Sequence, residues 1–158
     1  ALLPAAQLLP LWRSPKVVPE DDAPRLRVAT INLLASNREI ERAARWLEAT
    51  DPDVVALLEF TPAHEKALER LRAKWPFAAS KTVESPFGIA LWSKTELRDA
   101  EVFAFGASWS WAVRATTTTA IGEVAVLAIH PPPPRITAGP LATRPPIPLR
   151  WNAQPSPL

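Results

Sequence analysis

Three polar residues, Asn32, Glu59 and His130, lie at or near the ends of apolar segments. They close the runs "LRVATIN", "DVVALLE" and "EVAVLAIH". If these runs are strands of one sheet, their ends converge at one edge, where sites of layered α/β folds commonly form. A carboxylate and an amide oxygen are hard oxygen ligands of the kind that Mg²⁺ prefers. A histidine nearby would bind or protonate a phosphoryl oxygen, so the set suits metal-assisted hydrolysis of a phosphoester.

Each of these residues also has a purely structural interpretation, and the pattern alone leaves both open. Glu59 marks a point where a strand meets solvent, Asn32 forms a turn, and His130, which precedes four prolines, ends a strand. Arg114 lies within a further predicted strand, on the face opposite the two tryptophans. It either binds phosphate or pairs with a carboxylate. His64 falls in the first turn of a helix, and we expect it to be solvated.

The elements that must position these residues follow from hydrophobic periodicity. Helices over 37–49 and 62–74 follow the first two strands, and Gly122 predicts a hairpin between the last two. Runs that are apolar on both faces suit central strands covered on both sides. The order indicates a mixed sheet layered with helices, an α/β fold. The predicted strands are 26–34, 54–59, 87–93, 109–118 and 123–130.

Local sequence predicts where the two helices begin and end. Ser36 and Glu39 have capping-box spacing at the start of the first helix, and Asp51 with the following proline ends it. Thr61 followed by Pro62 starts the second. The residues expected to face inward are Ile40, Ala43, Ala44 and Leu47 in the first helix, and Ala67, Leu68 and Leu71 in the second.

Composition bounds the class of protein. The chain has 158 residues, 47% hydrophobic and 22% charged, which is typical of one globular domain. A net charge of +2 does not indicate a dense nucleic-acid-binding surface. There is no cysteine, which excludes disulfides and thiolate metal sites. No run of 18 apolar residues is present that would span a membrane.

Proline divides the chain into three parts. Of 19 prolines, five lie in residues 1–24, four in 25–130 and ten in 131–158. Because proline resists helix interiors and central strands, we expect a linker or membrane-proximal arm over 1–24. The domain then spans 25–135, and an irregular tail covers 136–158. The chain begins with alanine and has no methionine, so we expect a fragment or a processed product.

In order, "LRVATINLL", "PDVVALLEF", "GIALWS", "WAVRAT" and "VLAIHPPPP" resemble the endonuclease/exonuclease/phosphatase family, to which deoxyribonucleases belong. Within it, the resemblance is to a bacterial branch that is exported and tethered by N-terminal transmembrane helices. A faint echo follows in "RWNAQ" (150–154). The resemblance implies a four-layer α/β sandwich, in which two mixed sheets pack face to face with helices outside.

The resemblance also implies roles for the four candidate residues. Glu59 matches the family's metal-binding glutamate, and Asn32 matches an asparagine beside the metal and the phosphate. His130 matches the histidine that contacts the scissile phosphate, and Arg114 matches a substrate-binding arginine on the phosphate side. The implied cofactor is Mg²⁺ or Mn²⁺, and the implied reaction is in-line attack of water on phosphorus.

The chain departs from the family pattern in its second half. The family carries a later Gly-Asp-x-Asn motif and a terminal Asp-His, whereas here the last aspartate is Asp99 and the last histidine is His130. We therefore expect an N-terminal portion with the C-terminal half of the sandwich missing, weakly active or inactive alone. The alternative is a non-catalytic remnant or binding module that retains half of the sandwich.

Substrate and location stay open at this level. Nucleic acid, phospholipid and lipid pyrophosphate all fit a phosphoester substrate, and no obligate protein partner is evident. The resemblance implies a membrane tether N-terminal to this chain and an extracytoplasmic location, with a cytoplasmic location as the alternative.

Overall fold

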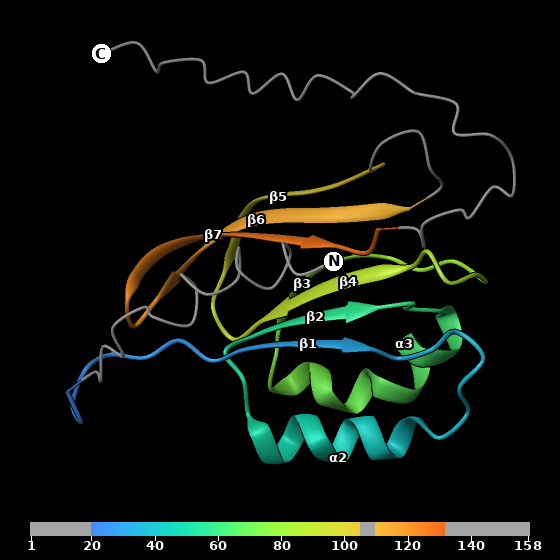
Figure 1. The fold of residues 1–158 in the computed structure, drawn as a ribbon, viewed down its shortest axis with the longest axis horizontal. Helices are drawn as coiled ribbons and strands as arrows, with labels where there is room; N and C mark the ends of the chain where they lie inside the picture. Colours follow the sequence, from blue (N-terminus) through green and yellow to red (C-terminus); the bar gives the residue numbers. More distant parts are fainter. Residues whose placement is uncertain (1–19, 105–109, 132–158) are drawn as a thin grey trace, which may run out of the picture.

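The described part of the chain is a three-layer α/β arrangement of one helical layer and two sheets (Figure 1). The computed structural model describes residues 20–104 and 110–131. The two sheets pack face to face, and the helices cover the outer face of one of them. The predicted α/β class, as part of a layered sandwich, is confirmed.

The first sheet has four strands in the order β1-β2-β4-β3. Strands β1 and β2 are parallel, and the other neighbours are antiparallel. Strand β4 is buried along its whole length, in agreement with an apolar run covered on both faces. The strands are β1 (Val28–Asn32), β2 (Val54–Leu58), β3 (Phe77–Lys81) and β4 (Ile89–Ser93).

The second sheet is an antiparallel meander of β5 (Leu97–Ala104), β6 (Trp111–Thr119) and β7 (Gly122–Ile129). The predicted hairpin is confirmed, and Gly122 at its turn has φ +106°. A register shift interrupts β5 between Arg98 and Glu101, where Asp99 has φ +51°. Strand β7 is not the doubly covered strand that its sequence predicts, because Leu127 is 57% exposed.

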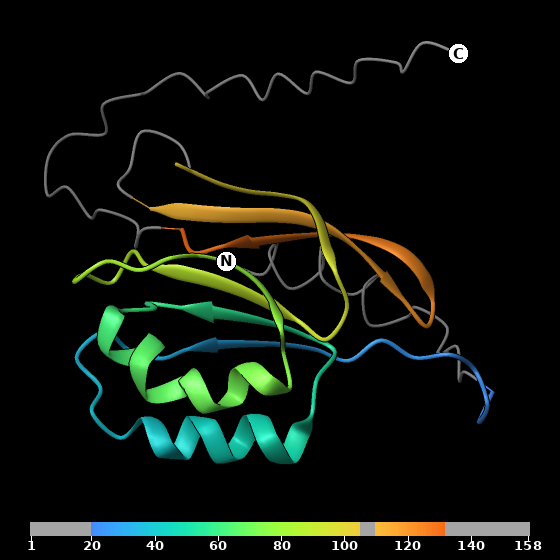
Figure 2. The same ribbon diagram turned by 180° about the vertical axis from the view of Figure 1, so that it is seen from behind.

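Helices α2 (Ile40–Thr50) and α3 (Pro62–Leu68) lie side by side on the outer face of the first sheet (Figure 2). A 3₁₀ segment, η1 (Glu69–Ala73), continues α3. Thr61 is the N-cap of α3, as predicted, and Asp51 ends α2 in the left-handed region. The predicted Ser36–Glu39 capping box is wrong. Glu39 is itself the N-cap and no side chain caps it.

Two hydrophobic cores hold the layers together. One lies between the helices and the first sheet and includes Leu47, Phe60, Trp75 and Trp92. There, the Trp75 indole Nε1 donates to the Pro52 carbonyl oxygen over 2.8 Å, which satisfies a buried donor. The other core lies between the two sheets, around Val54, Ile89, Leu91 and Val113.

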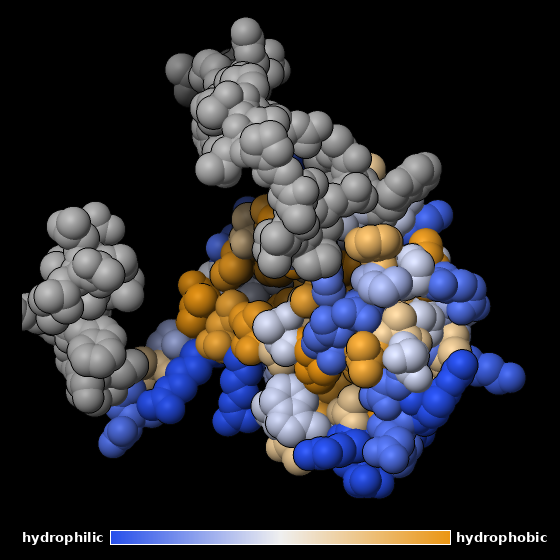
Figure 3. All heavy atoms as spheres, turned by 45° about the vertical axis from the view of Figure 1, so that its right-hand side comes forward, coloured by the Kyte–Doolittle hydropathy of each residue, from blue (hydrophilic) through white to orange (hydrophobic). Residues whose placement is uncertain are grey.

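The two sheets do not cover each other fully. The closest approach is between β3 or β4 and the second sheet, while β2 joins the core between the sheets through Val54. A crevice of about 260 Å³ opens between the two sheets, with Val28, Leu58, Val126 and Leu127 among its lining residues. Figure 3 shows hydrophobic residues gathered on the left of the described surface, with hydrophilic residues to the right and below.

The predicted linker (1–24) and tail (136–158) fall mainly or wholly outside the described residues, as does the "RWNAQ" segment. Those boundaries stay predictions. Across residues 20–104 and 110–131, none of the helices is long and apolar enough to cross a bilayer.

Replacing Leu47 by alanine tests the helix-to-sheet core. Leu47 is fully buried in that core, so we expect L47A to lower the free energy of unfolding by about 2–5 kcal/mol. Urea unfolding followed by tryptophan fluorescence measures the change. The matched control is R45A on the exposed face of the same helix, for which we expect a change within about 0.5 kcal/mol. Equal effects of both substitutions would contradict this assignment of the helix faces.

Candidate functional site

The parallel pairing of β1 and β2 brings two polar residues to one edge of the sheet. Asn32 pairs with Leu58 at the end of the ladder, so Glu59 follows directly beside it. The Asn32 amide Nδ2 donates to Glu59 Oε1 over 2.8 Å. Two residues 27 positions apart in sequence thus form one hydrogen-bonded pair, as expected from strand ends that converge.

Glu59 is held in a strained and largely buried position. Its exposed fraction is 9%, and its backbone has φ +57°, which costs a non-glycine residue about 1–2 kcal/mol. The backbone N–H of Phe60 donates to the Gly88 carbonyl oxygen over 3.0 Å. A Cβ on residue 88 would lie 2.0 Å from the Phe60 carbonyl oxygen, so glycine permits this close approach of β4.

Both carboxylate oxygens of Glu59 accept hydrogen bonds. Oε1 accepts from Asn32, and Oε2 accepts from the backbone N–H of Ala35 over 2.8 Å. Burial raises the pKa of Glu59. The hydrogen bonds from Ala35 and Asn32, with the charges of His130 and His64, outweigh that effect, so the pKa lies below its ordinary value. The side chain is therefore a carboxylate at neutral pH.

The segment after β1 turns so that one of its backbone N–H groups donates to the Glu59 carboxylate. Leu34 has φ +59°, and its backbone N–H donates to Asn32 Oδ1 over 2.8 Å. Because of this turn, the Ala35 N–H points to Glu59, and helix α2 begins only at Ile40. This explains why the capping box predicted at Ser36 does not form.

His64 is buried, at 1% exposed, and the prediction that it is solvated is wrong. Its ring lies between two loops, with Nδ1 3.1 Å from the Glu59 carbonyl oxygen and Nε2 3.3 Å from the Asn37 carbonyl oxygen. Its backbone N–H also donates to Thr61 Oγ1 over 3.3 Å. The helical spacing of His64 with buried Leu68 and Leu71 is the sequence pattern that indicates an inward position. Ala67, predicted inward, is exposed.

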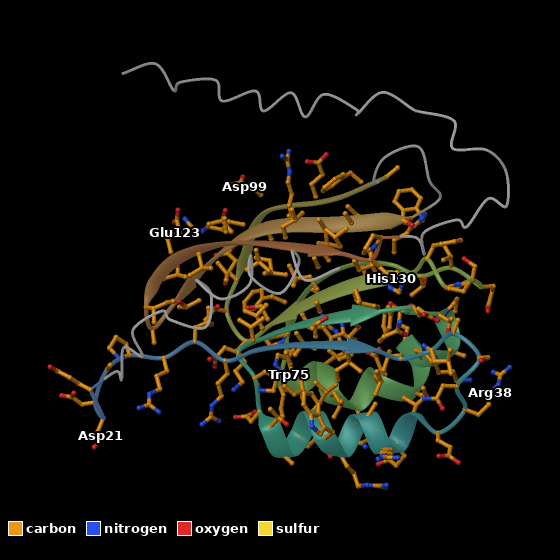
Figure 4. All side chains as sticks on the ribbon, in the orientation of Figure 1. Asp21, Arg38, Trp75, Asp99, Glu123 and His130 are labelled. Atoms are coloured by element: carbon orange, nitrogen blue, oxygen red, sulfur yellow. The ribbon has the colours of Figure 1, made fainter. Side chains whose placement is uncertain are left out.

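His130 follows β7 directly and lies at the end of the molecule where β1 and β2 also end (Figure 4). It is half-buried, and its charge helps to lower the pKa of Glu59. Its ring Nδ1 is buried and has no hydrogen-bond partner among the described residues. Because buried polar atoms nearly always have a partner, this unsatisfied nitrogen requires an explanation and makes His130 a candidate site residue.

Arg114 does not join this group. It lies on the outer face of the second sheet, 65% exposed, and its Nη2 is 2.5 Å from Glu101 Oε2 on β5. Its guanidinium also lies over the Phe103 ring, 6.0 Å from the centroid. The structural interpretation, an arginine paired with a carboxylate, describes this position, while its substrate-binding role stays a prediction.

The donor set at Glu59 fits one hard divalent cation loosely. Each carboxylate oxygen keeps a free lone pair, and so does Asn32 Oδ1, which already accepts from Leu34. An open hollow of about 390 Å³ reaches Glu59 between the loops at 34–38 and 84–86. Within residues 20–104 and 110–131, no three His, Cys, Asp or Glu side chains come together to hold a metal. Glu59 and Asn32 would leave most of the coordination shell to water.

Comparison with known proteins identifies the family. A model of the endonuclease/exonuclease/phosphatase family matches residues 29–154, most of the chain. The chain belongs to the endonuclease/exonuclease/phosphatase family. No curated protein matches it in sequence.

Solved structures share the fold of this family member at low sequence identity. TDP2 of Caenorhabditis elegans superposes with a TM-score of 0.60 and 15% identity, over 70% of this chain and 36% of that chain. D. rerio TDP2 complexed with single-strand DNA product gives 0.55 and 14%, over 65% and 44%. Sphingomyelinase C from Streptomyces griseocarneus gives 0.51 and 23%, over 68% and 49%. This family member thus spans less than half of each of these chains.

The hydrogen-bonded state of Glu59 predicts a pH dependence of stability. Because the folded-state pKa lies below the ordinary 4.5, Glu59 stabilises the fold above pH 4.5. That contribution is lost as the pH falls through the folded-state pKa. We expect E59Q to be less stable than wild type at pH 7, and the difference between them to shrink as the pH falls below 4.5. Urea unfolding at a series of pH values measures this difference.

Asp51 provides the matched control. Its pKa is also lowered, first by the hydrogen bond from Lys94 and then by that from Lys74, but these pairs lie at the surface. In 1 M salt the effect of D51N should fade, while that of E59Q persists, because salt screens exposed charges more than buried ones. A difference between E59Q and wild type that does not vary with pH would contradict the bonding described for Glu59.

Proposed function

We propose that this chain contributes the first metal-binding carboxylate and a phosphate-binding histidine to a divalent-metal-dependent phosphoester hydrolase. The observation that carries the proposal is Glu59. A strained, largely buried carboxylate is held ionised at a sheet edge by two hydrogen bonds, in a chain of the endonuclease/exonuclease/phosphatase family. Backbone strain of this kind is typical of functional sites.

The residues have separate tasks in this proposal. Glu59 binds Mg²⁺ or Mn²⁺, and Asn32 fixes the orientation of its carboxylate. The ion, when bound, neutralises charge on the phosphoryl group. The His130 ring donates to a phosphoryl oxygen and so stabilises the charge that develops there. Two findings support this assignment: His130 Nδ1 has no hydrogen-bond partner among the described residues, and the charge of His130 helps to lower the pKa of Glu59.

The same reasoning predicts that the 158-residue chain alone is a poor catalyst. The last aspartate of the chain is Asp99 and its last histidine is His130, so no later Asp–His pair is present to activate water. Loss of a general base typically lowers the rate ~10²- to 10⁴-fold. A binding module that retains this half of the sandwich is the second candidate, favoured by the lack, in the part of the chain that the structure describes, of three His, Cys, Asp or Glu side chains grouped to hold a metal.

For the substrate we propose a phosphoester, with nucleic acid, phospholipid and lipid pyrophosphate as the classes to test. One structural neighbour is a TDP2 complexed with single-strand DNA product, and another is a sphingomyelinase C. A membrane tether N-terminal to the chain and an extracytoplasmic location are further proposals, which rest on the sequence resemblance alone.

Metal binding tests the proposal directly. We expect Mn²⁺ to bind the purified chain weakly at one site, and E59Q to lower the affinity at least ~10-fold, because the first carboxylate ligand is lost. Electron paramagnetic resonance of free Mn²⁺ measures the dissociation constant. The matched control is E65Q, which removes an exposed carboxylate from helix α3 and should leave the affinity unchanged.

Hydrolysis assays complete the test. We expect slow or no turnover of a generic phosphodiester and a phosphomonoester with Mg²⁺ or Mn²⁺. Robust metal-dependent turnover that disappears in E59Q would show that the chain alone is a competent enzyme. Mn²⁺ affinity equal in wild type and E59Q would refute the metal-site proposal.

A further inference from the structure

We infer that His64 is a positioning residue for the Glu59 carboxylate, a role that rests on the proposed function of Glu59 as a metal ligand. His64 is 1% exposed and lies in the first turn of α3, five residues after Glu59. The side chain is polar and contacts both loops that form the site. A buried polar side chain in such contacts holds its partners in a defined geometry.

The first contact is with Glu59 itself. His64 Nδ1 lies 3.1 Å from the Glu59 carbonyl oxygen. The Glu59 backbone is in the left-handed region, which a glutamate leaves unless other contacts retain it. The imidazole therefore fixes the peptide group from which the carboxylate projects.

The second contact is with the loop that supplies a donor to the same carboxylate. His64 Nε2 lies 3.3 Å from the Asn37 carbonyl oxygen. Within that loop, the Asn37 N–H donates to the Leu34 carbonyl oxygen over 2.7 Å. The turn between them includes Ala35, whose N–H donates to Glu59 Oε2. The His64 ring thus contacts both Glu59, which accepts the hydrogen bond from the Ala35 N–H, and the loop that carries Ala35.

The two ring contacts distinguish a positioning role of His64 from simple packing. An apolar side chain of similar size fills the same space beside Leu68 but leaves two buried carbonyl groups without their ring contact. The loop at 34–37 and the Glu59 peptide are then free to separate, and the Ala35–Glu59 hydrogen bond weakens. In metal sites, loss of a residue that orients a ligand typically costs 10- to 100-fold in metal affinity.

The experiment compares H64L with two partial replacements. An asparagine amide nitrogen takes the place of Nδ1, and a glutamine amide nitrogen takes the place of Nε2. H64N therefore offers an N–H toward Glu59, and H64Q offers one toward Asn37. A neutral imidazole carries one N–H, and Nδ1 also lies 3.5 Å from the Thr61 backbone nitrogen, so the two variants identify which ring nitrogen is the donor. The matched control is L68A, which removes a fully buried side chain of the same helix that has no hydrogen-bonding group.

The primary readout is the nuclear magnetic resonance signal of two donors, the Ala35 backbone N–H and the Asn32 side-chain amide. In H64L we expect both signals to move toward their unbonded positions and the Ala35 amide to exchange with solvent at least ~10-fold faster. Whichever of H64N and H64Q replaces the donating nitrogen should restore part of both effects. In L68A the two signals should keep their wild-type positions although the protein unfolds at lower urea.

Mn²⁺ affinity is the second readout. H64L should bind Mn²⁺ roughly 10- to 100-fold more weakly than wild type, and L68A should bind it as wild type does. A folded H64L with wild-type Ala35 and Asn32 signals would overturn the inference. Wild-type protein without Mn²⁺ binding would count against the proposed function alone, because the two amide signals still decide whether His64 positions Glu59.

Discussion

The parallel pairing of β1 with β2 is the constraint on which the candidate site depends. It places Asn32 and Glu59 at the same edge of the sheet, where an amide and a carboxylate bond directly over 2.8 Å. The segments that follow β1 and β2 adopt unusual backbone conformations to permit this pairing. Leu34 and Glu59 take up positive φ, α2 begins at Ile40, and the N–H of Ala35 turns inward to the carboxylate. Burial that would otherwise disfavour the charge becomes tolerable because donors surround it.

Much of this arrangement could be predicted from hydrophobic pattern. Runs that are apolar on one or both faces located β1, β2, β4, β6 and β7, and the apolar stripe at Ile40, Ala44 and Leu47 identified the buried face of α2. The polar residues that close two of these runs, Asn32 and Glu59, do form a bonded pair. Strand ends are informative because an apolar run that stops on a carboxylate requires a physical reason.

The rest could not be predicted, for reasons visible in particular residues. Strand β3 is exposed along nearly its whole length and shows no alternation, and β5 is rich in charge and broken by a bulge at Asp99. Arg114 pairs with Glu101 on β5, a strand that the sequence did not predict. The helical spacing of His64 with Leu68 and Leu71 indicates an inward position, but the sequence does not show what its ring would contact. Here its ring nitrogens face two loop carbonyls that only the tertiary fold brings together.

The left-handed backbone of Glu59 has a consequence for how this protein changes over time. Glycine or asparagine at position 59 would relax the main chain, but would also remove the carboxylate that accepts from Asn32 and Ala35. The backbone and the side chain of this one residue thus act on stability in opposite directions. No natural residue combines the backbone freedom of glycine with a carboxylate of the same reach, so residue 59 has few neutral replacements even where the edge of the sheet is not used.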